Sequence, residues 1–107
     1  MKEIKFEKLV RDRIVESIRN QGDEPFYRVL EDDEYEVLLE RKLDEEVSEY
    51  HQDKTLEELA DVMEVVLALC AAKGYSTQDL IEIYHKKHDE KGGFSDKIYL
   101  ISKIVKN

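Results

Sequence analysis

Along most of this 107-residue chain, apolar residues recur every three or four positions among charged ones, which is the spacing of a helix face. In residues 6–20, Leu9, Ile14 and Ile18 recur at the spacing of one helix face. This segment is therefore predicted to form a helix. Residues 25–30, which begin with the chain's single proline, favour a short extended segment instead.

The longest stretch with apolar residues at helical spacing among charged ones predicts a helix from Asp32 or Asp33 to about His51. Asp33 and Glu36 have the spacing of a capping box, in which each side chain accepts a bond from the other residue's backbone N–H. We expect this box to start the helix.

Two further helices are predicted over residues 55–73 and 77–90. Thr55 and Ser76 occupy their N-cap positions, where a hydroxyl accepts a bond from the first helical turn. Glycine follows each helix, as Gly74 does the first, and glycine is the preferred residue after a helix C-terminus.

The C-terminal tail fits two alternatives. Ile98, Ile101 and Val105 suit a helix, whereas residues 97–101 suit a short strand beside residues 25–30. We therefore expect an all-α protein, an antiparallel helical bundle, with a minor short strand pair as an open alternative. A chain of this length fits one domain over residues 1–107.

The net charge of −9 argues against non-specific binding to nucleic acid or to an anionic membrane. It leaves nucleotides open, because a metal ion inverts the local sign of charge. The first residues contain no apolar leader, and the longest apolar run, residues 65–72, is too short to span a bilayer. These features predict a cytoplasmic protein.

The helix that ends near His51 carries a carboxylate on its apolar side. Glu46 falls inside the apolar stripe, Glu49 lies at its edge and Glu45 lies further round. The stripe consists of Leu39, Leu43, Val47 and Tyr50. A carboxylate in such a position is costly unless it is paired or binds a metal.

The helix over residues 55–73 carries one acidic stripe on an otherwise apolar surface. Its acids fall within roughly 120° of the helix circumference, and they are Glu57, Glu58, Asp61 and Glu64. The alternative to a metal site is an ordinary solvated face, with Glu58 serving only as the capping-box partner of Thr55. A solvated face usually mixes both signs of charge, and residues 55–72 contain no lysine or arginine.

The turn between these two helices is short enough to force them antiparallel. If the turn is centred between Asp53 and Lys54, Glu46 lies opposite Asp61, one carboxylate layer away from Glu49 and Glu58. At the helical rise per residue, the two layers are about 4.5 Å apart. Converging carboxylates of this kind suit hard cations such as Mg²⁺ or Mn²⁺.

The two acidic segments, EEVSE and EELAD, resemble the E-E-x-x-E … E-x-x-D signature of the MazG-like all-α nucleoside triphosphate pyrophosphohydrolases. KLVRDRI, RVLEDDEY, ELADVMEVVLAL and the late GGF are similar to one branch of this family, often described as phosphoribosyl-ATP pyrophosphohydrolase-like or as house-cleaning nucleotide pyrophosphatases. The similarity covers most of the chain in the expected order.

The resemblance implies Mg²⁺-dependent hydrolysis of a nucleoside triphosphate to the monophosphate and pyrophosphate, by a homo-oligomer such as a dimer or tetramer. Carried over by position, the metal ligands are Glu46, Glu49, Glu58 and Asp61, with Mn²⁺ as a substitute metal. Glu45 or Glu49 is the expected general base. The candidates for contacts with the phosphates are Lys8, Arg11, Arg13, Lys87 and Lys91.

A second function class remains open. The segment Leu59–Ala72 is apolar enough to pack against a partner chain, as in a non-catalytic helical dimerisation module. A response to divalent metal separates the two hypotheses, because a packing module has no reason to bind Mg²⁺.

Overall fold

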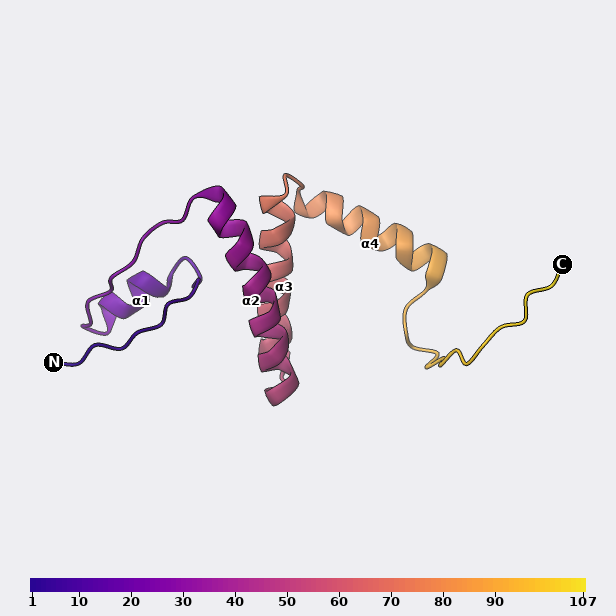
Figure 1. Cartoon of the computed structure of the whole chain (residues 1–107), viewed down its shortest axis with the longest axis horizontal. Coiled ribbons are helices and arrows are strands. Elements are labelled where there is room, and N and C mark those ends of the chain that lie inside the picture. The colour runs from indigo at the N-terminus through magenta and orange to yellow at the C-terminus, as the bar shows by residue number, and fades with distance from the viewer. The chain divides into compact units, whose positions relative to one another are not determined.

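The computed structural model describes all 107 residues and contains four helices and no strand (Figure 1). The all-α prediction is confirmed. The strand pair is wrong, because residues 25–30 make no backbone hydrogen bond to another extended segment. At the start of the tail, Lys97 has φ 60 and its N–H bonds back to the Phe94 carbonyl in a turn. No helix combines the length and the apolar composition that crossing a membrane requires.

The chain divides into two compact units, Met1–Tyr75 (unit 1) and Ser76–Asn107 (unit 2). Unit 2 contains one helix, α4 (Thr77–Lys91), which has no buried residue. Unit 2 therefore has no core of its own, as a separate domain would have. A single domain over residues 1–107 stays a prediction.

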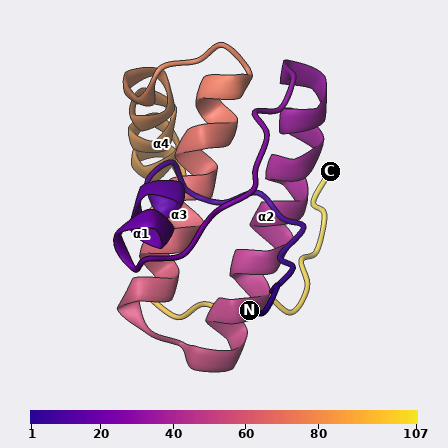
Figure 2. The same cartoon turned by 90° about the vertical axis from the view of Figure 1, so that its left-hand side faces the viewer.

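Unit 1 contains α1 (Ile14–Asn20), α2 (Asp32–Asp53) and α3 (Leu56–Ala72). The last two pack side by side as an antiparallel hairpin, which both views show (Figures 1 and 2). Lys54 makes the tight turn with a left-handed backbone of φ 54, and its N–H bonds to the Tyr50 carbonyl at 2.7 Å. The predicted hairpin is confirmed.

The core of the hairpin is small. Leu39 on α2 and Val65 on α3 are its buried apolar side chains, at 3% and 6% exposure. The third buried side chain of the protein is Glu46, which is charged. A carboxylate thus shares the most protected part of the hairpin with only two apolar side chains.

The first helix is shorter than predicted. It begins at Ile14 rather than within residues 6–13, and Glu7 has a left-handed φ of 49 that no α-helix accommodates. Outside a helix, the preceding segment directs Lys8 toward α2 and Arg11 toward α3, where both form ion pairs. These tertiary contacts replace the helical turns that local spacing predicts.

The helix starts differ in their capping. The predicted Asp33–Glu36 box is wrong, since α2 begins after Glu31 without a side-chain cap and Asp33 Oδ1 accepts from the adjacent Glu34 N–H at 2.9 Å. Asp33 lies inside the first turn, where its side chain reaches only the next residue. At the start of α4, by contrast, Ser76 and Asp79 form a complete capping box.

Thr55 caps α3, because its hydroxyl accepts the Glu58 N–H at 3.2 Å. Replacing Thr55 with Ala is expected to lower the free energy of unfolding by about 1 kcal/mol. Thr55→Ser keeps the hydroxyl and should stay near wild type in the same urea titration. Equal stability of the Ala and Ser variants would contradict a capping role.

Candidate metal centre

Five carboxylates gather along the hairpin in two clusters that share one residue. Glu45, Glu46 and Glu49 form the first cluster on α2, and Glu46, Glu58 and Asp61 form the second between α2 and α3. Within each cluster, one ligand oxygen from every residue lies within 4.8 Å of the others. The predicted placement of Glu46 opposite Asp61 is therefore confirmed.

Helix geometry produces this convergence. Glu46 and Glu49 are three residues apart on α2, and so are Glu58 and Asp61 on α3, so each pair lies on one face of its helix. The turn at Lys54 then brings the two faces together. The arrangement depends on the length of the turn as much as on the acids themselves.

Glu46 is the most protected ionisable group of the site, at 8% exposure. Its Oε1 lies 3.3 Å from Lys42 Nζ, while its Oε2 is buried without a hydrogen-bond partner. Burial raises the pKa of Glu46, and its hydrogen bond with Glu49 raises it further against the opposing effect of Lys42. A proton or a cation is thus favoured at this carboxylate.

Glu58 is half-buried and also has an Oε2 without a partner. Burial raises its pKa, and the negative charges of Asp53, Asp61 and Glu46 add to the effect. Its carboxylate does not return a capping bond to Thr55, which contacts only the Glu58 backbone. Only half of the Thr55–Glu58 capping box forms, so capping does not account for the Glu58 side chain.

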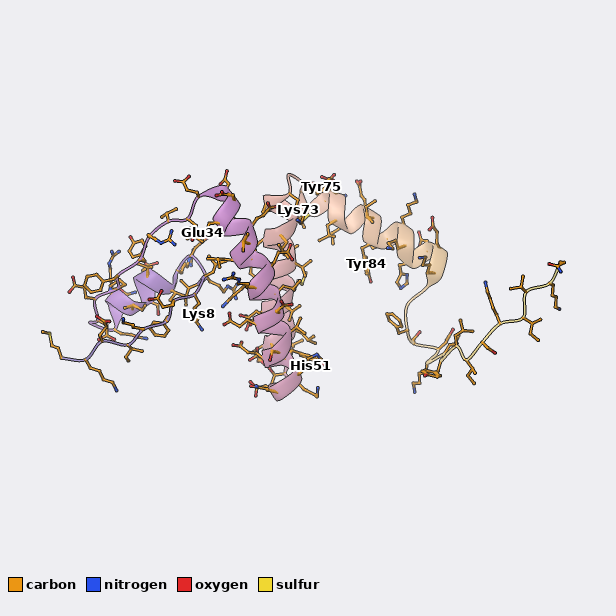
Figure 3. All side chains as sticks on the ribbon, in the orientation of Figure 1. Lys8, Glu34, His51, Lys73, Tyr75 and Tyr84 are labelled. Carbon is orange, nitrogen blue, oxygen red and sulfur yellow. The ribbon has the colours of Figure 1, made fainter.

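Lys42 is the closest cation to the buried carboxylate. Its Nζ lies 3.2 Å from Glu45 Oε1 and 3.3 Å from Glu46 Oε1, and its side chain is only 14% exposed. Lys8 adds a second contact to Glu45 Oε1 at 3.5 Å, and Figure 3 shows it beside α2. Sequence reasoning missed Lys42, although its spacing of three and four residues from the glutamates indicates the contacts.

Arg11 compensates the acidic stripe of α3. Its Nη1 lies 3.2 Å from Asp61 Oδ1 and its Nη2 lies 3.1 Å from Glu64 Oε1. This contact explains how α3 carries several acids without a lysine or arginine of its own among them. The positive charge comes from a segment about fifty residues away in the sequence.

The predicted phosphate-binding residues differ in their placement. Lys8 and Arg11 lie on the carboxylates, while Arg13 is exposed, precedes α1 and forms no ion pair. Lys87 and Lys91 belong to α4 in unit 2, where both are exposed. Lys91 also lines a shallow hollow of about 150 Å³ with the residues that follow it.

A larger hollow of about 470 Å³ lies at the other end of the hairpin from the turn. It is lined by Asp32, Asp33, Tyr35, Glu36, Ala71 and Ala72. Figure 3 marks the two ends with His51 near the turn and Lys73 at the far end. Glu36 is ten residues from Glu46 along α2, which is about 15 Å, so this hollow is separate from the carboxylates.

The donor set fits a hard divalent cation. All candidate ligands are carboxylate oxygens, which Mg²⁺ and Mn²⁺ prefer over nitrogen or sulfur. The two buried oxygens without partners, on Glu46 and Glu58, supply lone pairs that nothing in the chain satisfies. A metal ion bound between α2 and α3 would satisfy both.

Comparison with known proteins adds little to this geometry. No family model matches the chain. A stretch of 41 residues is 61% identical to a protein of Mycolicibacterium smegmatis that is named only as uncharacterized, covering 38% of this chain and 42% of that protein. This chain thus spans less than half of that relative. No solved structure matches.

Proposed function

We propose that the protein is a Mg²⁺-dependent nucleotide pyrophosphohydrolase, which hydrolyses a nucleoside triphosphate to the monophosphate and pyrophosphate. The observation that carries the proposal is the buried Glu46, whose unpartnered Oε2 shares a cluster with Glu58 and Asp61. The resemblance of EEVSE and EELAD to the MazG-like signature supplies the reaction.

Four of the clustered carboxylates are the proposed metal ligands. Glu46, Glu49, Glu58 and Asp61 would hold the metal, with Mn²⁺ able to replace Mg²⁺. When bound, the ion neutralises the charge of the phosphates and of the transition state. Without it, a triphosphate and this group of acids repel each other.

Glu49 is the better of the two candidates for the general base. Two cations, Lys8 and Lys42, already contact Oε1 of Glu45. Glu49 takes part in no ion pair, so a carboxylate oxygen that does not hold the metal would be available to accept a proton from water. Lys8 and Arg11 stand beside the carboxylates, where they can meet the phosphates.

The proposed biological role also follows the resemblance to the MazG-like family. We place the protein in house-cleaning of the nucleotide pool, as a cytoplasmic homo-oligomer, either a dimer or a tetramer. Neither nucleic acid nor a membrane is needed as a partner, in keeping with the net charge of −9.

A non-catalytic interaction module is the second candidate, because α3 exposes apolar side chains. Leu59, Met63 and Val66 are 48%, 58% and 37% exposed on this helix. Exposed apolar positions of this kind fit a contact with a partner chain. The hypotheses differ in their response to metal, because only binding to the folded state raises its stability, by RT ln(1 + [L]/Kd).

The decisive experiment measures pyrophosphate release from a panel of canonical and modified nucleoside triphosphates, with Mg²⁺ and with EDTA. We expect pyrophosphate release with Mg²⁺ and none with EDTA. In Asp61→Asn the rate of release should fall by about 100-fold or more, because losing a metal ligand should cost more than losing a residue that only orients a ligand. Asp44→Asn, at an exposed position of α2, makes the same chemical change outside both clusters and should remain active.

The proposal fails if no substrate releases pyrophosphate and Mg²⁺ leaves the melting temperature of the folded protein unchanged. The interaction module would then be the better explanation of the hairpin.

A further inference from the structure

Arg11 links a carboxylate inside the acidic clusters to one outside them. Asp61 belongs to the cluster between α2 and α3, whereas Glu64 belongs to neither cluster. One nitrogen of the guanidinium contacts each of them, at 3.2 Å and 3.1 Å. The two contacts therefore respond differently when a cation enters the site.

A divalent cation and Arg11 compete for Asp61. The cluster that contains Asp61 includes the side chain of Glu46, which is nine-tenths buried and has an unpartnered oxygen, so a cation has a reason to bind there. If Asp61 bound a divalent cation, the +2 charge of that cation would cancel or reverse the attraction between Asp61 and a guanidinium. Glu64 keeps its full negative charge for Arg11.

We propose that Glu64 is a positioning residue, which retains Arg11 beside the metal centre when the metal takes Asp61 and so presents the freed guanidinium edge to the phosphates. This inference rests on the proposed function and adds to it an ordered exchange. Arg11 neutralises the metal-free site through Asp61 and Glu64. With a metal held at Asp61, Arg11 would keep its contact with Glu64, and the N–H groups that now face Asp61 would be available as donors to phosphate oxygens.

The exposure of the cations explains why Arg11 suits this exchange better than Lys42. The Arg11 side chain is 60% exposed and Glu64 is 50% exposed, so the guanidinium can turn without disturbing the hairpin core. Lys42 is 14% exposed and lies between two glutamates, which hold it in place. A planar fork also offers two parallel donors, which suits phosphate geometry better than an ammonium.

The first test measures Mg²⁺ affinity by calorimetry on the full chain without nucleotide. Arg11→Gln removes the competitor and should tighten Mg²⁺ binding about two- to fivefold, the range that an exposed ion pair supports. Arg28→Gln is the matched control, since it removes the same charge from an exposed pair with Glu34. Equal Mg²⁺ affinity in wild type and Arg11→Gln would overturn the exchange, as would an equal gain in both variants.

The second test measures binding of inorganic tripolyphosphate at saturating Mg²⁺. Glu64→Gln should weaken binding several-fold although it removes a negative charge, whereas a purely electrostatic role of Glu64 would strengthen binding. In the Arg11→Gln background, Glu64→Gln should have no further effect, because its role runs through Arg11. An equal loss in both backgrounds would overturn the positioning role.

These outcomes separate the inference from the function on which it rests. Wild-type protein that binds Mg²⁺ and releases pyrophosphate, but fails either test above, retains the proposed function and loses the exchange. Wild-type protein that is folded and binds no Mg²⁺ overturns both. Circular dichroism of each variant confirms folding, which the exposure of both side chains favours.

Discussion

Glu46→Gln is expected to stabilise the metal-free protein while abolishing both its response to Mg²⁺ and its pyrophosphate release. The buried carboxylate has one oxygen without a partner and several acids nearby. An amide removes the charge, keeps an acceptor for Lys42 and places a donor beside the carboxylates of the second cluster. We expect a gain of about 1–2 kcal/mol in EDTA, comparable to satisfying one buried polar group.

The same substitution removes the carboxylate that both clusters share, which is the proposed metal ligand. Mg²⁺ should then raise the melting temperature of wild type but not of Glu46→Gln, and pyrophosphate release should fall by at least about 100-fold. The substitution should thus raise stability and lower activity, which is typical of a functional site whose residues destabilise the fold.

Thermal unfolding followed by circular dichroism, with EDTA and with Mg²⁺, checks this expectation. Glu40→Gln is the control, because Glu40 is exposed on the same helix and contacts only Lys73 at 3.8 Å. If Glu46→Gln melts below wild type in EDTA, the carboxylate contributes to stability and the interpretation of Glu46 as a metal ligand loses its main support.

Local spacing was sufficient to predict the hairpin and its shared carboxylate. The helical pattern of α2 and α3 is long and strongly periodic, and the short turn at Lys54 makes the two helices antiparallel neighbours. The proximity of Glu46 and Asp61 therefore follows from helix spacing and turn length, which can both be read from the sequence. The Thr55 and Ser76 caps are local in the same sense.

The errors occur where tertiary contacts override local preference. The segment before Ile14 has helical spacing, yet it forms no helix. Glu7 has a left-handed backbone, and Lys8 and Arg11 lie against acids on other elements. No spacing rule relates Arg11 to Asp61, which lies about fifty residues away. The periodicity of apolar residues does not show which distant cation neutralises a given carboxylate.

The strand pair failed for a related reason. Aromatic and β-branched residues indicate that a segment can form a strand, but the pairing itself depends on a partner at the right place. Residues 25–30 have no such partner, and the tail begins with the turn at Lys97. The roles assigned to the site residues stay predictions, since geometry brings carboxylates together without identifying the ion or the substrate.

The metal-free protein should lose stability as the pH rises above about 4.5, the ordinary value of a glutamate pKa. Burial raises the pKa of Glu46 and of Glu58 in the folded state, so the native protein binds more protons than the unfolded chain between the ordinary and the raised values. Stability falls with pH wherever the native state binds more protons. The loss is complete once the pH exceeds both raised pKa values.

Mg²⁺ should reverse this dependence, because a carboxylate must lose its proton before it binds a metal. As the pH rises, the melting temperature in EDTA should decrease while the stabilisation by Mg²⁺ increases. One carboxylate acts in the opposite sense, since Arg28 lowers the pKa of Glu34 and that pair stabilises the fold above the ordinary value. A Glu34→Gln background removes this contribution.

The sharpest measurement is the difference in melting temperature between Glu46→Gln and its parent in that background, taken in EDTA from pH 4 to pH 8. Because only the parent must deprotonate the buried carboxylate, the advantage of the amide should be small at the acid end and should grow as the pH rises. A difference that is constant across the whole range would mean that Glu46 has an ordinary pKa in the folded protein. The gain in stability would then come from packing, and the cluster would have no special preference for a proton or a cation.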